Sequence, residues 1–492
     1  MIMKTLWQKT SEDGDSGTGM APDRSWFFRF TAEEDRELDR HLIPYDILVN
    51  IAQARMLRKV GIYNEEGFIN VTNALSEAWD QWGKGTFDLG PDDEDVHSAV
   101  EKFVTEKAGQ DGARIHTGRS RNDQVLADMR LFMKESAVEI AVDWIEVAKR
   151  LEALAKSYNG VMFAGMTHTQ PAMPHSVDAW AAGYLDLLLS DVRALQSAVE
   201  LVDQSPLGSA AGYGVPYIRV DREFVSEQLG FARVQVPVAA SQLSRGRFEM
   251  QLVDALGYGA LTFNRLASDV VLFMHPSWSL VTLSEDQVSG SSIMPQKRNP
   301  DAWELIRGAY HDFQAARSHL AGVSANLTSG YHRDLQVVKK SVMAAVVQSK
   351  MLAEAVRFAL DGLEFDKEAA KRSLRPEIFA THQANKLVAE GMPFREAYQK
   401  VVASSRDAES GSGKKSGDKS GSGQETGFGP ESGGEDSAGH TAENVAGTDV
   451  YYHTGAPGSG VPSALHDDLA RAGNWVTAKM DHWERTKSEL LS

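Results

Sequence analysis

Five long stretches of this chain repeat apolar residues at intervals of three and four positions. They run over Val125–Leu154, Trp180–Val202, Phe248–Met274, Trp303–Val323 and Leu335–Leu363. This spacing gathers apolar side chains on one face of an α-helix. At 1.5 Å per residue, such helices reach roughly 30–50 Å, which is long for a globular protein. The sequence therefore predicts a mainly α fold with an elongated central five-helix bundle, much of whose apolar surface packs against sister chains.

The segments on either side of the bundle are shorter, and strand-like alternation is scarce. We expect a helical N-terminal domain over residues 1–119, the long-helix bundle over 120–372 and a helical C-terminal domain over 373–492. The N-terminal and C-terminal domains are the smaller two.

Two segments fall outside this helical pattern. Residues 1–30 are expected to form a mobile lead-in. Between 404 and 463 the chain is rich in Gly and Ser with few apolar residues, which is typical of a disordered insertion. An amphipathic pattern returns with Leu465, Trp475 and Met480 and predicts a C-terminal helix.

Charge and cysteine content exclude several classes of protein. The chain has 51 Lys and Arg against 68 Asp and Glu, a net charge of −17. Nucleic-acid binding needs a cluster of positive charge, and no such cluster occurs in the sequence. The absence of cysteine excludes disulfides, thiolate metal sites and cysteine nucleophiles. No apolar run approaches the roughly 18 residues needed to span a bilayer, and the N-terminus is too acidic for a signal peptide. We expect a cytoplasmic protein without nucleic-acid or membrane partners.

Three segments that are far apart in sequence combine small polar residues with Gly or Pro. They are His116–Val125 (HTGRSRNDQV), Gly165–Pro171 (GMTHTQP) and Gly290–Asp301 (GSSIMPQKRNPD). Each lies near an end of a predicted long helix, so an antiparallel bundle can bring some of them together. The third segment carries two adjacent serines and a lysine on one loop. Hydroxyl and amide donors beside a cation suit a site that binds and deprotonates a carboxylate-bearing substrate.

These segments resemble the argininosuccinate lyases of the fumarase/aspartase superfamily. GSSIMPQKRNPD looks like the signature loop of the superfamily, and Gln296-Lys297 within it looks like the argininosuccinate lyase version. HTGRSRNDQV looks like the hallmark of argininosuccinate lyases and of the eye-lens crystallins derived from them. The resemblance runs from about Asp39 to Lys400 and includes Pro206–Ser209, Tyr331–Lys339 and Gly391–Arg395.

The resemblance implies a fumarase/aspartase-like fold and the cleavage of argininosuccinate to arginine and fumarate, a step of arginine biosynthesis. It also implies a homotetramer whose sites are shared between subunits, and the reaction needs no metal or other cofactor. By the same resemblance, Ser291 is the base, helped by Lys297 and loop amides to hold negative charge. His168, oriented by Glu304, protonates the leaving nitrogen. Such an acid and base predict a bell-shaped pH profile.

The resemblance also marks residues that contact the substrate. They are Asn122, Thr167, Ser292, Asn299, Tyr331, Gln336 and Lys339. Ser292 is expected to bind carboxylate, and the segment that contains the last three to recognise the arginine end. A lysine facing an α-carboxylate is reasonable chemistry. Arg119 and Arg121 either steer an anionic substrate or cap a helix.

Two positions depart from the family pattern. The family's N-terminal Asn-x-Ser segment, whose serine contacts the substrate, aligns with Glu33–Asp35, where no hydroxyl stands. Asp35 can still accept a hydrogen bond from an ammonium or guanidinium group of the substrate. The Gly-Gly-Thr-type turn near the C-terminus is replaced by GAPGSGVPS at residues 455–463.

Three further histidines are expected to have structural or supporting roles. His97, His116 and His332 lack the i, i+4 spacing with a carboxylate partner that a helical metal site would show.

Three other interpretations remain open. The chain could be a related lyase acting on another fumarate adduct such as adenylosuccinate, a crystallin-like homologue without turnover, or a helical interaction scaffold built around the insertion. HTGRSRNDQ and Gln296-Lys297 argue against the first. The presence of every expected acid, base and lysine argues against the second. The third predicts that deleting residues 405–450 destroys function.

Overall fold

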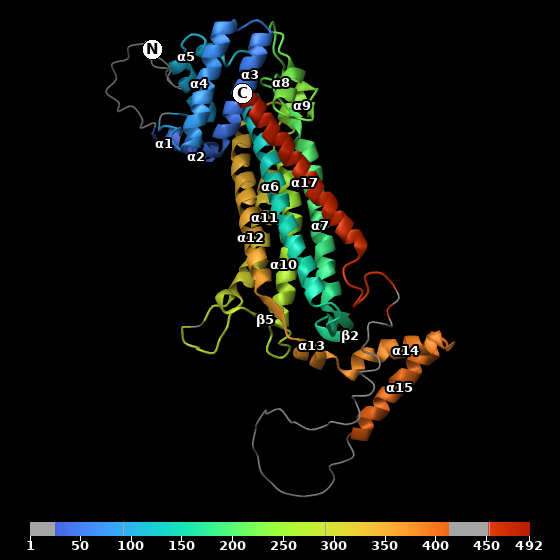
Figure 1. Ribbon diagram of the computed structural model, residues 1–492. Coiled ribbons are helices and arrows are strands. Elements are labelled where there is room, and N and C mark those ends of the chain that lie inside the picture. The colour runs from blue at the N-terminus through green and yellow to red at the C-terminus, as the bar shows by residue number, and fades with distance from the viewer. Residues whose placement is uncertain (1–24, 92, 291, 413–450, 452) are drawn as a thin grey trace.

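The computed structural model describes residues 25–91, 93–290, 292–412, 451 and 453–492, and most of these residues are helical. The molecule is elongated, with a group of short helices at one end and helices α13 to α15 at the other (Figure 1). Among the described residues, no helix is both long enough and apolar enough to cross a membrane.

The predicted five-helix bundle is confirmed. Its helices are α6 (Arg121–Ser157), α7 (Val177–Val202), α10 (Arg247–Phe273), α11 (Asp301–Ser324) and α12 (Val338–Asp361). They lie side by side along the length of the molecule, and consecutive members run in opposite directions (Figure 1). Segments that precede and follow each helix are therefore gathered at the two ends of the bundle.

The bundle core requires close helix contact. Trp144 of α6 meets Phe263 of α10 edge to face, with ring centroids 6.3 Å apart. A Cβ atom at Gly259 would lie 2.4 Å from the Trp144 ring, so only glycine fits at this position. Both aromatic side chains are almost completely buried, and each such burial stabilises the fold by about 1.5–3 kcal/mol.

Short helices form the N-terminal end of the molecule. They are α1 (Ser25–Phe28), α2 (Glu34–Asp39), α3 (Ile43–Lys59), α4 (Glu65–Gly83) and α5 (Val96–Ala108), with a π-helical segment at Arg29–Glu33 and 3-10 turns at Arg40–Leu42 and Gly112–Arg114. Residues 25–30 were expected in a mobile lead-in, but they are helical, so that predicted segment is too long. Residues 1–24 lie outside the described part of the chain.

The described strands are short and form three two-stranded sheets. β1 (Met162–Thr167) and β2 (Gln170–Ser176) make an antiparallel hairpin between α6 and α7. β3 (Gln204–Ser205) pairs in parallel with β4 (Arg233–Val234), and β5 (Val281–Leu283) pairs antiparallel with β6 (Leu363–Phe365). Helices α8 (Arg222–Gln228) and α9 (Val238–Leu243) lie in the connection between α7 and α10. The first hairpin matters most, because it contains GMTHTQP.

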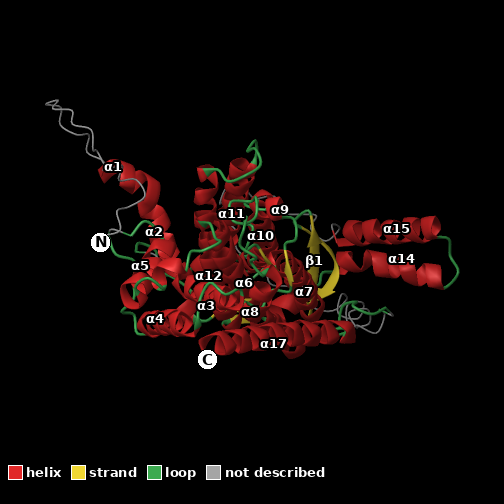
Figure 2. Cartoon of the chain, turned by 90° about the horizontal axis from the view of Figure 1, so that it is seen from above, coloured by secondary structure: helices red, strands yellow, loops and turns green. Residues whose placement is uncertain are grey.

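The C-terminal part begins with α13 (Lys367–Ser373), a 3-10 turn at Pro376–Phe379 and α14 (Ala380–Ala389). Helix α14 and α15 (Phe394–Ser412) project from the bundle as a pair, whereas α17 (Ser463–Leu491) lies along the bundle beside α7 (Figure 2). Helix α17 is the predicted C-terminal helix.

Both flanks of the predicted disordered insertion have defined structure. Helix α15 continues to Ser412, past the expected start of the insertion at residue 404. On the other side, the Gly458 N–H donates to Ser176 Oγ at 2.9 Å and the Gly460 N–H to Asp178 Oδ2 at 3.0 Å. The segment GAPGSGVPS is thus attached to the start of α7. Residues 413–450 lie outside the described part of the chain, and the three-domain division stays a prediction.

Candidate active site

A cavity of about 220 Å³ lies between the N-terminal helices and the adjacent end of the bundle. Its wall contains Asn122, Tyr331, Gln336 and Lys339, four of the residues predicted to contact substrate. Asn122 stands in the first turn of α6, and Lys339 in the first turn of α12. Gln336 belongs to the 3-10 turn Arg333–Val337 that precedes α12. The fold brings these four residues together within one chain.

Lys339 is buried and paired with two carboxylates. Its Nζ lies 2.6 Å from Oδ1 of Asp35 and 2.5 Å from Oδ1 of Asp39. Burial disfavours the ammonium charge, but the two carboxylates outweigh burial and raise the pKa of Lys339 above its usual value. Oδ2 of Asp39 also accepts the Val96 N–H at 3.1 Å. The lysine is therefore charged and held in the cavity wall.

Two other predicted contacts in this cavity have fixed orientations. The Gln336 side-chain amide donates to the Thr31 carbonyl oxygen at 2.8 Å. The guanidinium group of Arg245 lies over the Tyr331 ring, 4.8 Å from its centroid. Arg245 is buried, so this cation–π contact is sheltered from water.

The segment HTGRSRNDQV forms the start of α6 through a capping box. Ser120 caps the helix, and its N–H donates to Asp123 Oδ1 at 2.9 Å. The second carboxylate oxygen of Asp123 accepts the N–H groups of Gly208 and Ala210 at 3.1 and 2.8 Å. The residues PLGS at 206–209 are thereby joined to the same helix start. Asp123 thus links two motifs that are far apart in sequence.

The two arginines of this segment have different environments. Arg119 is partly buried and donates to Asn50 Oδ1 at 2.7 Å and to the Ile115 carbonyl oxygen at 2.9 Å, which is a structural role. Arg121 lines the cavity and pairs with Glu94 at 3.2 Å and Asp95 at 3.0 Å. Of the two arginines, the one positioned to meet a ligand is Arg121.

Thr167 and His168 lie at the exposed tip of the β1–β2 hairpin. His168 and Thr169 have φ values of 54° and 58°, in the left-handed region that residues other than glycine seldom adopt. The Thr169 hydroxyl donates to the His168 carbonyl oxygen at 2.6 Å. The Thr-His pair thus lies in a hairpin turn and does not cap a helix. A hairpin tip with this backbone presents the imidazole to the outside of the chain.

The loop Gly290–Asp301 is anchored at its base, and its residues 292–298 are exposed. Ser289 and Asn299 exchange backbone hydrogen bonds of 3.2 and 2.9 Å, and the Asn299 amide donates to Ser289 Oγ at 3.3 Å. Within the loop, the Lys297 N–H donates to the Met294 carbonyl oxygen at 3.0 Å. Ser292 and Lys297 are exposed. Ser291, the predicted base, lies outside the described residues.

Glu304 lies in the first turn of α11, directly after this loop, and its side chain is exposed. It approaches Arg307 at 3.9 Å, one turn further along the helix. Among the described residues of this chain, no hydrogen bond or ion pair joins Glu304 to His168. The predicted histidine–glutamate pair is thus not formed within one chain.

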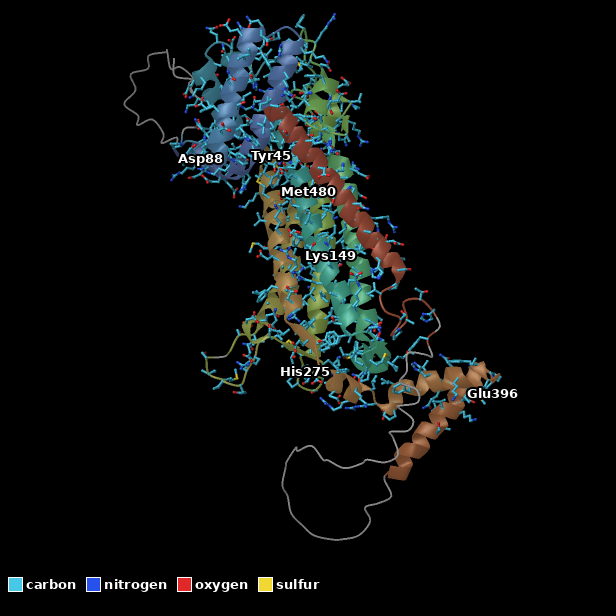
Figure 3. The ribbon with its side chains drawn as sticks, viewed as in Figure 1. Tyr45, Asp88, Lys149, His275, Glu396 and Met480 are labelled. Atoms are coloured by element: carbon cyan, nitrogen blue, oxygen red, sulfur yellow. The ribbon has the colours of Figure 1, made fainter. Side chains whose placement is uncertain are left out.

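The predicted site residues stand at two ends of the molecule. Helix α11 has 24 residues and separates the Lys297 loop from Tyr331 by roughly 36 Å at 1.5 Å per residue. Helix α6 has 37 residues and separates Asn122 from the His168 hairpin by roughly 55 Å. Asp88, in the group of N-terminal helices, and His275, just after α10, mark these two ends (Figure 3). A single chain therefore cannot bring all the predicted groups to one substrate.

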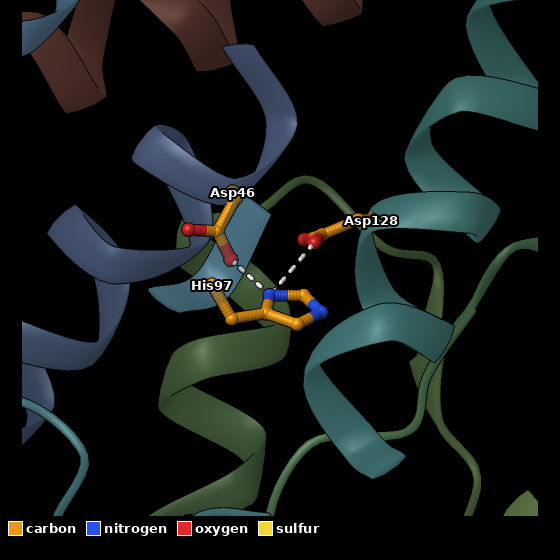
Figure 4. Close-up of side chains that lie close together, drawn as sticks. All are labelled: Asp46, His97 and Asp128. Atoms are coloured by element: carbon orange, nitrogen blue, oxygen red, sulfur yellow. Dashed lines mark hydrogen bonds and ion pairs between the residues drawn. The ribbon is translucent and has the colours of Figure 1, made fainter. Parts of the chain in front are cut away.

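A buried charged cluster behind the cavity was not predicted. His97 Nδ1 lies 2.7 Å from Asp46 Oδ1 and 3.6 Å from Asp128 Oδ2 (Figure 4). Burial opposes the imidazolium charge, but the aspartates outweigh it and raise the pKa of His97 to about 9. Burial and Asp46 raise the pKa of Asp128 well above its usual value. The candidate ligand atoms lie within 4.8 Å of one another, which is the spacing that a metal site would need.

The structure also shows the surroundings of His116 and His332. His116 is partly buried, and burial together with Arg119 and Arg121 lowers the pKa of its imidazole to about 4. His332 lies beside Thr328, with Nε2 3.0 Å from the hydroxyl oxygen.

The cluster around His97 was not predicted because its members come from α3, α5 and α6, and no spacing in the sequence relates them.

Comparison with known proteins identifies the family. The chain matches the family model described as "Lyase" over residues 24–313. It is 41% identical to the argininosuccinate lyase of Thermotoga neapolitana over 375 residues, which is 76% of this chain and 94% of that protein. It is 40% identical to the argininosuccinate lyase of Sorangium cellulosum, covering 76% of this chain and 87% of the relative.

Solved structures share the fold at much lower identity. An EDDS lyase variant with bound fumarate superposes with a TM-score of 0.76 at 18% identity, over 96% of this chain and 95% of that one. A class II fumarase from Schistosoma mansoni superposes with a TM-score of 0.59 at 16% identity, over 74% and 87% of the two chains. These likenesses confirm the expected fumarase/aspartase-like architecture. The two sequence relatives show that the chain belongs to the argininosuccinate lyase family.

Proposed function

We propose that this protein cleaves argininosuccinate to L-arginine and fumarate by β-elimination. The observation that carries the proposal is the 41% identity to a protein named argininosuccinate lyase, spread over 94% of that relative's length. A substrate of this kind has carboxylates at both ends and a guanidinium group between them. The charged cavity and the Ser-Lys loop are suited to such a molecule.

The elimination needs a base for a very weakly acidic proton. Ser291 removes the proton from the carbon next to a carboxylate, and the electron pair moves into that carboxylate to give a dianionic aci-carboxylate. Lys297 and the Asn299 amide stabilise this charge, and preorganised donors of this kind supply a few kcal/mol each. The C–N bond then breaks, with His168 giving its proton to the leaving nitrogen and Glu304 orienting the imidazole. The products are fumarate and arginine, whose guanidinium group carries the proton given by His168.

Substrate contacts divide between the two ends of the molecule. Ser292 and Thr167, on the exposed loop and hairpin, are proposed to hold the succinate carboxylates. Asn122, Tyr331, Gln336 and Lys339 share the cavity wall and are proposed to hold the remainder of the substrate, including its arginine end.

This division supports a homotetramer with shared sites. Because α11 and α6 keep the two sets of residues apart within one chain, a complete site needs the loop and hairpin of other copies. Large apolar side chains on four bundle helices are exposed in the single chain, as expected of surfaces that sister chains cover. They are Leu187, Tyr258, Leu261, Leu305, Val347, Met351 and Phe358. The cytoplasmic location stays a prediction.

The proposed function is tested by the absorbance of fumarate, with argininosuccinate and adenylosuccinate supplied side by side to the purified protein. We expect fumarate release from argininosuccinate alone. Release from adenylosuccinate alone would assign the other lyase activity, and release from neither would support the crystallin-like alternative. Formation of the adduct from fumarate and arginine is the matching measurement in the reverse direction.

A further inference from the structure

The ammonium group of Lys339 has two carboxylate partners in this structure. Asp35 and Asp39 stand one turn apart on α2, so both carboxylates face the same side of the helix. They reach Nζ of Lys339 at 2.6 and 2.5 Å. A substrate carboxylate that approached this lysine would therefore meet a cation whose charge is already balanced.

The two aspartates are held differently. Asp39 has 1% of its side chain exposed, and its second oxygen accepts the Val96 N–H. Asp35 has 16% of its side chain exposed and lines the cavity. Within the described part of the chain, Lys339 is its only ion-pair or hydrogen-bond partner. Asp35 can exchange that partner for a ligand, whereas Asp39 is fixed.

The charges in the cavity wall balance before any ligand enters. Four carboxylates and four permanent cations line the cavity. The carboxylates belong to Asp35, Asp39, Glu94 and Asp95, and the cations to Arg121, Arg245, Arg333 and Lys339. His97 also reaches this wall, but it is paired with Asp46 and Asp128 behind it. A lone carboxylate would add an unbalanced negative charge here. A zwitterionic group adds one charge of each sign and keeps the balance.

We propose that Asp35 and Lys339 form a clamp for the zwitterionic α-amino-acid group of the substrate, with Asp35 accepting the α-ammonium group and Lys339 binding the α-carboxylate. This inference rests on the proposed function, which supplies such a group at the arginine end of the substrate. On binding, the Asp35–Lys339 ion pair is exchanged for two new ion pairs, so each charge keeps a partner. The serine that the family pattern has at this position carries no charge for this exchange. Asp35 is thereby a specificity-determining residue of this chain.

The clamp is tested in the reverse reaction, with fumarate and either arginine or 5-guanidinopentanoate, which is arginine without its α-amino group. We expect the wild type to prefer arginine by roughly 10²-fold in kcat/KM, because the analogue leaves Asp35 without its partner. Asp35→Ser and Asp35→Asn should reduce this preference to below about tenfold. The loss should lie in a raised KM for arginine, with kcat and the kinetics of the analogue little changed.

Glu34→Ser is the matched control. Glu34 precedes Asp35 on the same helix, but its side chain is exposed and pairs with Lys340, outside the cavity wall. This variant should keep the wild-type preference. A preference that is unchanged in both Asp35 variants would overturn the clamp. A lower KM for arginine in Asp35→Ser would also overturn it, because Asp35 would then be blocking Lys339.

The pH dependence of KM provides a second measurement that needs no variant. Burial raises the pKa of Asp35 and Lys339 lowers it, while Asp39 and Asp95 raise it; together they give a pKa of about 6. Arg245 is the other charged group nearby. The carboxylate must be ionised to hold an ammonium group. In the wild type, KM for arginine should therefore rise as the pH falls through about 6, while KM for the analogue does not. A KM for arginine that fell over this range would contradict the clamp.

Failure of the clamp and failure of the proposed function give different results. If the wild type releases no fumarate from argininosuccinate, the proposed function is wrong, and the clamp is wrong with it. If the wild type releases fumarate but uses arginine and 5-guanidinopentanoate equally well, the clamp alone is wrong. This comparison remains decisive even if both Asp35 variants fail to fold.

Discussion

At the scale of single residues, the proposed chemistry depends most on the Ser291 hydroxyl. Ser291→Ala removes the base and keeps the size and backbone of the loop. We expect kcat to fall by about 10³-fold or more with KM and assembly unchanged, because an interaction made only in the transition state is lost. The measurement is steady-state fumarate release, together with the mass of the assembly in solution.

The control for this prediction is Ser277→Ala. Ser277 is an exposed serine at the same end of the bundle, just after α10, and it is outside the loop. Its removal should leave kcat unchanged. Near-normal turnover of Ser291→Ala would remove Ser291 from its role as base, and an equal loss in both variants would point to folding instead.

His97 predicts a pH dependence of stability. Its folded-state pKa of about 9 lies above the usual value of 6.5, so the protonated imidazole stabilises the fold fully below pH 6.5. This contribution, of order 3 kcal/mol, is lost as the pH rises from 6.5 through 9. The thermal midpoint of the wild type should fall over this range. His97→Gln should be less stable at pH 6.5 and lose this part of the pH dependence; an equally steep fall in the variant would contradict the assignment.

The sequence defines the environment of a residue where a local motif is present. Ser120 and Asp123 cap α6 because a serine followed three residues later by an acid satisfies the free N–H groups of a helix start. It did not predict the cluster of Asp46, His97 and Asp128, since that cluster exists only after three helices pack. The ion pair of Asp35 with Lys339 was missed for the same reason, because the two residues are about three hundred positions apart.

At the scale of single elements, one face of α12 is expected to form part of an interface between copies. Val347, Met351 and Phe358 lie on the same side of this helix and are 52%, 60% and 47% exposed. Met351→Glu would bury an unpaired carboxylate there, so we expect the assembly to dissociate and activity to fall by at least about tenfold. Light scattering after size-exclusion chromatography measures the first effect, and fumarate release measures the second.

Met351→Leu is the matched control, since leucine keeps the apolar surface and nearly the same volume. It should leave mass and activity as in the wild type. A Met351→Glu protein that stayed assembled and fully active would show that this face of α12 is solvent-exposed in the functional protein.

The long helices could be predicted to within a few residues because their apolar periodicity extends over many turns. The apolar pattern over Val125–Leu154 corresponds to α6, which spans Arg121–Ser157. The length of these helices was enough to predict the bundle. The hairpin around His168 could not be predicted in this way. Its strands have six and seven residues, are largely exposed along GMTHTQP and show no clear alternation. Its shape depends on the left-handed residues at the tip, which no propensity favours.

At the scale of the whole molecule, the Gly/Ser-rich part of the chain is expected to be dispensable for catalysis. On its N-terminal side the described chain ends with α15, and on its C-terminal side Gly460 is hydrogen-bonded to Asp178 of α7. Replacing residues 413–450 by a flexible linker of about ten residues should therefore leave kcat/KM within roughly twofold of the wild type. Fumarate release by the purified deletion protein is the measurement. An assembled but inactive deletion protein would favour the interaction-scaffold alternative.

The opposed positions of the two proposed half-sites restrict how copies of this chain can be arranged. For the Lys297 loop of one copy to reach the Lys339 cavity of another, the two bundles must lie alongside each other with reversed polarity. A two-fold axis perpendicular to the helices produces this arrangement, and it repeats every such contact in a symmetry-related position. Half-sites joined in this way are completed in pairs, so an odd number of copies would always leave one loop and one cavity unused.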